Sequence, residues 1–438
     1  MVAITLLLAA SSLAASTEKV LYSFAGPAAG DGFGPQSGLA FDAKGNLYGT
    51  TSDGGTGAGC LNGCGTVFQL TSNKHGGWQE TVIYNFQGDV TDGDFPNTTP
   101  VVDAAGNVYG MTKDGPQSCG IVYKLTPSRS GGFTETLIHI FSTSVHNNDG
   151  CINGDPSQVH INPLIMDKNG NLYGSTAFGG GGSSNRVCRN GCGIVFKLAS
   201  QSDGTWKETI LHHYPTDSGR EGFSPTVYQL DDAGNLYGLA GGGCSSCAGL
   251  VFKLSPSKQG NWPETVLFQS HISDLATVPV GGLLMDKAGN FFAPTYGPQC
   301  NSCGGAIARL SPAGGGKYKA TIIHVFKNHD GVIVNSGLLK DAAGNLYGTT
   351  LYGGGRGTSN CPNGEDGCGT IYTLSPASNG KWHERILFRF DDNTDGGVPA
   401  DDVLLQDAHQ NIYGTTSAGG KVIFSNGATG GNVFELTH

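Results

Sequence analysis

The sequence predicts an all-β fold, a seven-bladed β-propeller made of four-stranded antiparallel blades. Three observations lead to this prediction. A Gly-Asn-Leu-Tyr-Gly motif, first seen at 45–49, recurs along the 438-residue chain. Short runs of β-branched and aromatic residues follow most copies and are bounded by Gly, Pro, Asn and Asp, as strands are. The two ends of the chain carry complementary parts of one repeat. A period of about 60 residues suits a four-stranded blade better than a leucine-rich or helical repeat.

The Asn of the motif gives the period. It stands in seven copies, at Asn46, Asn107, Asn171, Asn235, Asn290, Asn345 and Asn411. The fifth copy is degraded to Gly-Asn-Phe-Phe-Ala at 289–293. Seven copies at a near-constant spacing indicate seven structural units.

The first two strands of each unit, a and b, flank the motif. An apolar run that ends in Asp, such as 39–42, precedes a turn of small and polar residues, where Gly can adopt positive φ. Strand b contains a Gly, for example Gly49. We interpret this Gly as a position where a neighbouring sheet approaches too closely for a side chain.

The next two strands, c and d, follow a Gly-rich loop. Strand c reads Gly-Thr-Val-Phe-Gln-Leu at 65–70, and strand d reads Glu-Thr-Val-Ile-Tyr-Asn-Phe at 80–86. Residues 18–24 resemble a strand d with no blade before it, and 433–438 form a strand c with no strand d after it. We therefore predict that the N-terminal strand completes the last blade, which would remove two exposed sheet edges.

Residues 1–16 are predicted to form a signal peptide, and 17–438 a single propeller domain. The apolar run 2–15 is too short to span a membrane and is typical of a secretory signal, although no Lys or Arg precedes it. The alternative is a buried strand. We expect a secreted, periplasmic or cell-surface protein with no membrane insertion.

Twelve cysteines agree with export. Ten of them fall in pairs within single b–c loops: Cys60/Cys64, Cys188/Cys192, Cys244/Cys247, Cys300/Cys303 and Cys361/Cys368. Cys119 and Cys151 remain, in loops that the propeller topology places on one face, and we predict that they pair. The alternative is zinc, because Cys244/Cys247 and Cys300/Cys303 have the spacing of metal knuckles. These pairs lie on separate loops, so disulfides are favoured and no metal site is predicted.

The formal net charge is −10, and the sequence has no run of Lys or Arg. These features argue against nucleic acid or an anionic membrane surface as a partner. We expect a monomer whose partner is a protein or a glycan.

The d–a loops contain the weak candidates for ligand binding. An acidic residue followed by Gly recurs in six of these loops, at Asp31, Asp92, Asp149, Glu221, Asp330 and Asp395. His146 joins Asp149 in the longest d–a loop. A ring of carboxylates could bind Ca²⁺ or a hydroxylated ligand. The favoured alternative is that each forms a turn with its own backbone, because a structural residue is needed in every blade. No catalytic motif is present, so we assign no catalytic residue and no cofactor other than this Ca²⁺.

These motifs together resemble a known repeat. Asp-Gly-x-x-Pro, Leu-x-x-Asp-x-x-Gly-Asn-Leu-Tyr-Gly-Thr-Thr and Gly-Thr-Val-Phe-x-Leu are similar to the tandem repeat of the GloVer, choice-of-anchor family of exported bacterial proteins. The resemblance covers nearly all of the chain after residue 16, and the fifth unit departs from it. It implies an exported propeller, and it brings no established activity and no catalytic residue.

Two hypotheses follow for function. The leading one is a secreted, non-enzymatic scaffold that binds a protein or glycan on its disulfide-rich loop face. The alternative is a metal-dependent hydrolase or lyase with its site in the central channel, similar to lactonase or streptogramin-lyase propellers. Such an enzyme should break the repeat symmetry with several polar residues at one end of the channel.

Overall fold

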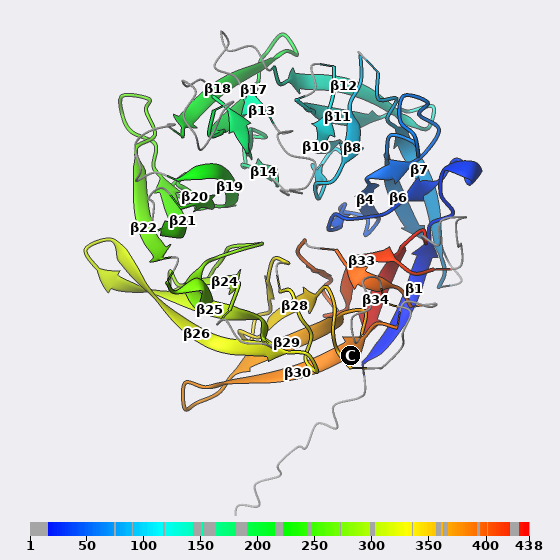
Figure 1. The fold of residues 1–438 in the computed structure, drawn as a ribbon. Helices are drawn as coiled ribbons and strands as arrows, with labels where there is room; N and C mark the ends of the chain where they lie inside the picture. The colour runs from blue at the N-terminus through cyan, green and yellow to red at the C-terminus, as the bar shows by residue number, and fades with distance from the viewer. Residues whose placement is uncertain are drawn as a thin grey trace, which may run out of the picture.

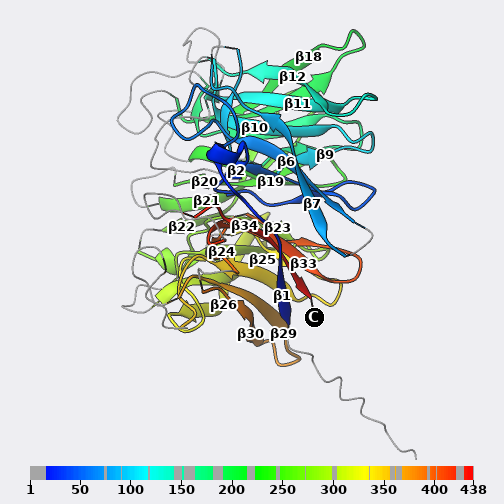
Figure 2. The ribbon, with the colours of Figure 1, turned by 90° about the vertical axis from the view of Figure 1, so that its right-hand side faces the viewer.

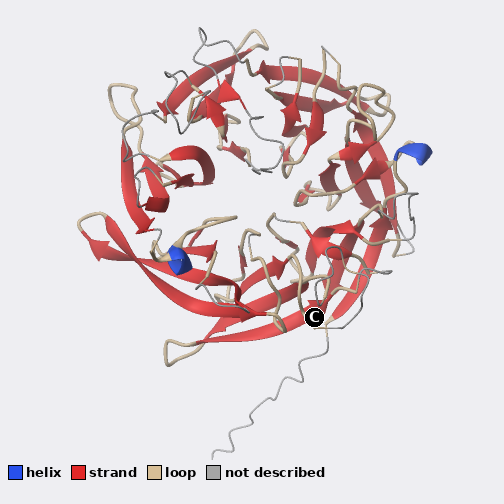
Figure 3. Cartoon of the chain, viewed as in Figure 1, coloured by secondary structure: helices blue, strands red, loops and turns tan. Residues whose placement is uncertain are grey.

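A computed structural model shows a ring of antiparallel sheets (Figure 1). It describes residues 16–73, 76–89, 91–116, 119–142, 150–151, 163–180, 191–214, 222–242, 247–271, 273–297, 303–334, 336–355, 361, 367–391, 395–400, 402–420 and 429–437. Within these ranges the only helical segments are two single 3₁₀ turns, η1 (Pro27–Ala29) and η2 (Leu275–Thr277) (Figure 3). In the same ranges, no helix has the length and apolar character needed to cross a membrane.

The chain forms seven blades in sequence order around the ring, which confirms the predicted fold (Figure 1). In each, strands a to d pair consecutively. The first blade contains β3 (Ala40–Phe41), β4 (Leu47–Thr51), β6 (Thr66–Ser72) and β7 (Trp78–Asn85), and the second contains β9 (Val101–Val102), β10 (Val108–Asp114), β11 (Ile121–Pro127) and β12 (Phe133–Ile140). The third blade contains β14 (Ile165–Met166), β15 (Leu172–Thr176), β17 (Ile194–Ser200) and β18 (Trp206–His213), and the fourth contains β19 (Phe223–Leu230), β20 (Leu236–Gly241), β21 (Cys247–Leu254) and β22 (Glu264–His271). The fifth blade contains β23 (Leu284–Met285), β24 (Phe291–Thr295), β25 (Cys303–Gly314) and β26 (Lys317–Lys327), and the sixth contains β27 (Leu339–Lys340), β28 (Leu346–Thr350), β29 (Thr370–Pro376) and β30 (Trp382–Arg389).

The seventh blade closes the ring. It contains β32 (Leu405–Gln406), β33 (Ile412–Ala418) and β34 (Asn432–Thr437), and its outermost strand is β1 (Thr17–Ser23). The register pairs Thr17 with Thr437 and Ser23 with Asn432. The N-terminal strand therefore supplies the missing strand d, as predicted.

Most innermost strands are shorter than the sequence suggests. Strand a of the first blade has two residues, because the chain that precedes it is crowded against other blades near the axis. A Cβ added at Gly38 would lie 3.0 Å from the carbonyl oxygen of Val403, in the seventh blade. The small circumference at the axis thus limits how far strand a can extend.

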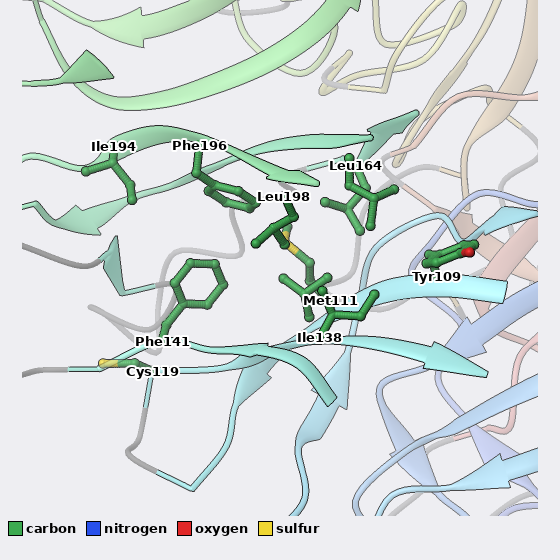
Figure 4. Close-up of a cluster of buried hydrophobic side chains, with 11 residues drawn as sticks. Tyr109, Met111, Cys119, Ile138, Phe141, Leu164, Ile194, Phe196 and Leu198 are labelled. Atoms are coloured by element: carbon green, nitrogen blue, oxygen red, sulfur yellow. The ribbon is translucent and has the colours of Figure 1, made fainter. Parts of the chain in front are cut away.

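The core consists of apolar layers between successive blades. Figure 4 shows the layer between the second and third blades, where Phe141 packs against Phe196 with ring centroids 5.2 Å apart. Met111 and Ile138 from the second blade and Ile194 from the third complete the contact. Each such layer is therefore built from the side chains of two successive blades.

The Gly in strand b has a different cause from the one the sequence suggested. A Cβ at Gly49 would lie 2.4 Å from the ring of Phe68, which is its cross-strand partner in the same blade. The Phe side chain of strand c therefore lies over the Gly, and no neighbouring sheet is needed to explain it.

Candidate functional site

The antiparallel topology gives the ring two different faces. The b–c and d–a connections emerge on one side, which we call the loop face, and the a–b and c–d turns emerge on the other, the turn face. Figure 2 shows the ring from its edge, with the turns next to β12 and β18 projecting from one side.

On the turn face, the repeated Asp, Asn and Tyr form one hydrogen-bond network in each blade. Oδ1 of Asp103 accepts bonds from the N–H groups of Ala105 and Asn107, each at 2.9 Å. Its Oδ2 accepts from Asn107 Nδ2 at 2.7 Å and from the Tyr109 hydroxyl at 3.0 Å. Partial burial raises the pKa of Asp103, but these donors outweigh it and lower the pKa overall. The motif is therefore a structural turn.

The fifth blade satisfies the same carboxylate in another way. Phe292 stands where the other blades have Tyr and has no hydroxyl to donate. Nζ of Lys340, from the sixth blade, lies 3.6 Å from Asp286 Oδ2 and 5.5 Å from the centre of the Phe292 ring. A cation from the next blade therefore replaces the missing hydroxyl group.

A cleft of about 290 Å³ opens on the turn face. It lies between the first two blades and is lined by Asp42, Tyr48, Gln69 and Asp103 among others. The lining carboxylates are the turn acceptors just described, and Gln69 Nε2 donates to the Tyr48 hydroxyl. These polar side chains of the cleft are therefore already hydrogen-bonded within the turn networks.

On the loop face, the acidic residues with described side chains bond within their own loops. Asp31 is buried, and its carboxylate accepts from the N–H groups of Ala25 at 2.7 Å and Gly32 at 2.6 Å. Asp92 is equally buried and accepts from the N–H groups of Gln87 and Gly93, at 2.8 and 2.6 Å.

Asp330 and Asp395 differ from these two. Oδ1 of Asp330 lies 2.7 Å from Nε2 of His329, and Asp395 Oδ1 accepts from the Asp391 N–H at 3.2 Å. Burial, together with the neighbouring Asp391, raises the pKa of Asp395 to about 8. The remaining candidates, His146, Asp149 and Glu221, lie outside the described residues.

A residue with left-handed backbone follows each described acidic-Gly pair. Phe95, Ile333 and Val398 have φ of 51°, 60° and 52°. The N–H of Phe95 donates to the Cys64 carbonyl oxygen, and that of Val398 to the Cys368 carbonyl oxygen, both at 2.9 Å. The d–a loop is thereby fixed to the b–c loop of the blade it leaves, at the cost of a conformation that branched side chains rarely adopt.

Disulfides reinforce the same loops. Cys60 is bonded to Cys64 and Cys361 to Cys368, with Cα atoms 5.2 Å apart in each pair. Three more cysteines are disulfide-bonded: Cys119, Cys192 and Cys247. The side chains of the other five lie outside the described residues: Cys151, Cys188, Cys244, Cys300 and Cys303.

At the axis of the loop face, polar side chains break the repeat symmetry. Asp402 stands near the position that Gly38 has in the first blade, and its carboxylate accepts from the Gly38 N–H at 3.2 Å and from the Thr99 hydroxyl. Tyr228 donates its hydroxyl to the Gly281 carbonyl oxygen. Burial and the nearby Asp402 raise the pKa of this Tyr.

Sequence reasoning missed this axial group. Aligning the residues before strand a would have shown it, because Gly38 and Gly337 hold related places in their repeats while Thr99, Tyr228 and Asp402 do not match them. In the part of the chain that the structure describes, no three His, Cys, Asp or Glu side chains are grouped so that they could hold a metal ion.

The described part of the chain exposes four large hydrophobic side chains, and all belong to the loop face. Leu61 (99% exposed) and Tyr296 (64%) lie in b–c loops. Ile333 (47%) and Val403 (40%) lie in d–a connections. The turn face has no counterpart among these residues.

Several solved structures have a similar fold. An ulvan lyase, a polysaccharide lyase solved with -[GlcA(1-4)Rha3S]- bound, has a TM-score of 0.54 at 12% identity over 95% of both chains. A luciferin-regenerating enzyme has a TM-score of 0.43 at 11% identity, over 97% of this chain and 95% of that one. The α-L-arabinofuranosidase Arb93A of Fusarium graminearum has a TM-score of 0.43 at 12% identity, over 77% of this chain and 91% of its own. At such identities the likeness concerns the fold alone.

The comparison by sequence is more specific. No curated protein sequence matches this chain. Residues 151–362 match the model of the Gloeobacter/Verrucomicrobia repeat, the family that the motifs resemble. The match confirms the resemblance over residues 151–362 of the chain.

Proposed function

We propose that this propeller is an exported, non-enzymatic binding protein whose loop face binds a glycan. One observation carries the proposal: the large hydrophobic side chains exposed by the described residues all belong to that face. Large apolar side chains that are exposed on one face and not on the other favour that face as the interaction surface. The disulfides that stiffen the same loops support export and a preformed surface.

The chemistry of the face favours a neutral glycan. Tyr296 offers an apolar ring and a hydroxyl, and a sugar needs both because its rings carry C–H faces and hydroxyl groups. At the axis, Asp402 and Thr99 add polar groups beside the exposed Val403. An anionic polymer is disfavoured, because the chain has a net charge of −10.

The test is a binding assay with purified, oxidised protein against a panel of neutral and acidic polysaccharides. Affinity electrophoresis should show retardation by at least one neutral polysaccharide. Tyr296→Ala and Val403→Ser should each weaken binding about tenfold, the effect expected for losing a contact of roughly 1.4 kcal/mol. Lys258→Ala, in an exposed turn on the opposite face, is the matched control and should bind like the wild type.

Three results would contradict the proposal. Binding that survives both loop-face substitutions but is lost in Lys258→Ala would place the ligand on the turn face. Failure to bind every polysaccharide, together with stoichiometric capture of a purified protein, would make the partner a protein. Retardation only by acidic polysaccharides would contradict the charge argument.

The second candidate is a hydrolase or lyase acting at the axis, which the symmetry-breaking Asp402, Thr99 and Tyr228 favour. The described residues do not fit the metal that such an enzyme would use. Among the described residues at the axis, the carboxylate belongs to Asp402. Its oxygens already accept hydrogen bonds from the Gly38 N–H, the Thr99 hydroxyl and the Val403 N–H. Release of shorter or unsaturated products from a bound polysaccharide, abolished by Asp402→Asn, would favour this candidate over the scaffold.

A further inference from the structure

Between the first and second blades, one hydroxyl group lies between two carboxyl groups. The Tyr84 hydroxyl, on β7, is 3.1 Å from Asp92 Oδ2 and 2.6 Å from Glu135 Oε2, on β12. Asp92 belongs to the loop that connects the blades, so the three groups join one blade, the crossing loop and the next blade. We call such a contact between successive blades a seam.

The hydrogen atoms at this seam can be counted. A phenol has one proton, so the Tyr84 hydroxyl can donate to only one of the two carboxyl groups. Burial raises the pKa of Asp92, but two backbone N–H groups also donate to its carboxylate and favour the ionised form, and Glu135 has no such donors in the described part of the chain. The short contact to Glu135 is then satisfied if Glu135 carries its own proton and donates it to the Tyr84 oxygen. The geometry thus indicates a chain from protonated Glu135 to Tyr84 to ionised Asp92.

The same arrangement recurs where the ring closes. Between the seventh and first blades, the Tyr22 hydroxyl on β1 donates to Asp31 Oδ2 at 2.8 Å. Glu80 on β7 holds the place that Glu135 holds in the second blade, since each pairs with the last Leu of its strand c. Both Asp31 and Glu80 raise the pKa of Tyr22, after burial, which shows that the three groups face one another.

At two further seams another residue replaces the tyrosine, while the acidic residues of the crossing loop and of the next blade are present. Between the fifth and sixth blades, His324 stands in its place, with Asp330 and Glu384 as the acids and His329 and Arg389 nearby. Between the sixth and seventh blades, Phe388 stands there, and Glu18 faces Asp391 and Asp395.

Between the second and third blades, His139 replaces the tyrosine. Its Nε2 lies 3.7 Å from Glu208 Oε1, so protonation of this imidazole also favours closure of the seam.

The seam between the fourth and fifth blades is an internal control, because all three elements are replaced together. Phe268 stands at the tyrosine position, Ala320 at the glutamate position, and the crossing loop has no acidic-Gly pair. Joint loss is expected if the three groups serve one another, since a lone buried carboxyl group would have no partner.

One carboxyl oxygen of each of four seam glutamates has no hydrogen-bond donor among the described residues. Oε1 atoms of Glu18, Glu80, Glu135 and Glu384 are buried and accept no hydrogen bond in the described structure. An ionised carboxylate buried in this way is costly, whereas a neutral carboxyl group is tolerated. Tyr123 and Tyr372, on the strands next to Glu135 and Glu384, are the other titratable groups that face them.

We propose that protonated glutamic acid side chains close the seams, so that the ring is a pH-sensitive assembly, tightest in mild acid and looser above neutral pH. This proposal does not depend on the proposed glycan binding. Burial, and then the facing Asp31, raise the pKa of Glu80 to about 8. Burial, together with Asp92, raises the pKa of Glu135 to about 7.

The direction of the pH effect follows from linkage. A carboxyl group whose pKa is higher in the folded chain than in the unfolded chain binds an extra proton when folded. Its stabilisation is complete below the ordinary glutamate pKa of 4.5 and is lost as pH rises to about 7 for Glu135 and about 8 for Glu80. Within this window the unfolding equilibrium constant should rise about tenfold per pH unit for each such group.

The test measures unfolding of the full, oxidised chain as a function of pH. Wild type should lose stability between pH 5 and 8, and Glu80→Gln with Glu135→Gln should reduce the slope of log K against pH by about two protons, because Gln stays neutral. Asp232→Asn, at an exposed position, is the matched control and should leave the slope unchanged. Ala320→Glu should add a further loss of stability as the pH rises from 5 to 8.

A second measurement keeps the test valid if the double variant does not fold. The infrared spectrum of wild type at pH 6.5 should show a protonated carboxyl band that weakens at pH 9. Constant or rising stability from pH 5 to 8, a double variant with the wild-type slope, or absence of the protonated band at pH 6.5 would each overturn the proposal.

Discussion

The hydroxyl of Tyr84 in the first blade lies 2.6 Å from a carboxyl oxygen of Glu135 in the second. This contact joins neighbouring blades through their outermost strands, β7 and β12. Where the arrangement is complete, one blade contributes a tyrosine hydroxyl group to the seam and the next blade contributes a glutamate carboxyl group. A propeller made from such units depends on the protonation of buried side chains as well as on apolar packing.

Stability should pass through a maximum in mild acid. Hydrogen-bond donors lower the pKa of the turn carboxylates, such as Asp42 and Asp103, although burial alone would raise it. Their stabilisation is present above their ordinary pKa of 3.8 and is lost as pH falls through the folded values. The seam glutamates act in the opposite direction up to pH 7 to 8. In thermal melts from pH 3 to 9, the melting temperature should be highest between the pKa of the turn carboxylates and that of the seam glutamates. A highest melting temperature at pH 8 or above would contradict this prediction.

Removing the hydroxyl of the turn network should cost a measurable amount. Tyr109→Phe deletes the bond to Asp103 Oδ2, so the free energy of unfolding in urea should fall by about 1 kcal/mol. The fifth blade is the natural comparison, because it already has Phe292 and uses Lys340 instead. Lys340→Met should therefore cost a similar amount. A silent Tyr109→Phe would show that the hydroxyl contributes nothing.

Replacing a non-glycine residue that has left-handed backbone in a crossing loop should increase the stability of the protein. Val398→Gly relieves a branched side chain at φ 52° and should stabilise the protein by up to about 1 kcal/mol. The first blade offers the reverse experiment, because Gly34 already occupies this position at φ 65°. Gly34→Ala should destabilise, and chemical denaturation of both variants measures the pair of effects. If Val398→Gly is destabilising, the Val side chain contributes more through packing than its backbone costs.

Ring closure can be tested by moving one strand. Deleting residues 17–23 leaves β34 without its partner, so the truncated chain should aggregate through the exposed edge. The control is a permuted chain in which residues 17–25 follow Thr437 through a short turn. This arrangement is feasible because Thr17 and Thr437 are paired, and the Thr437 hydroxyl donates to the Thr17 carbonyl oxygen at 3.3 Å. The permuted chain should be soluble and monomeric by light scattering, and a monomeric truncated chain would contradict closure.

The disulfides can be mapped on the native protein. Non-reducing peptide mapping should recover Cys60–Cys64 and Cys361–Cys368. It should also join Cys119 to Cys151, a pair that only the propeller topology brings to one face. Free Cys119, or zinc retained by Cys244 and Cys300, would contradict the prediction of disulfides throughout.

Much of the fold could be read from the sequence because each blade repeats the same local chemistry. Asn46 and its six equivalents mark a turn that is satisfied within its own hairpin, so periodicity alone located the strands. The same property hides the contacts between blades. Tyr84 and Glu135 belong to two different sheets, so their contact depends on how those sheets are placed, which no local pattern encodes.

The axial group was missed for a related reason. Asp402, Thr99 and Tyr228 come from blades distant in sequence, and each departs from the repeat in its own way. A search for repeated features passes over residues that occur once. Single departures from a repeat at equivalent positions would have been the better signal for a site at the axis.

The most direct test of the proposed function is a hydrogen-exchange footprint with a bound polysaccharide. Amides of the loop face, in the segments around Leu61, Tyr296, Ile333 and Val403, should exchange more slowly when the ligand is present. Amides of the turn-face hairpins at 42–46 and 103–107 should be unchanged. Protection confined to those hairpins, with the loop face unaffected, would contradict the account.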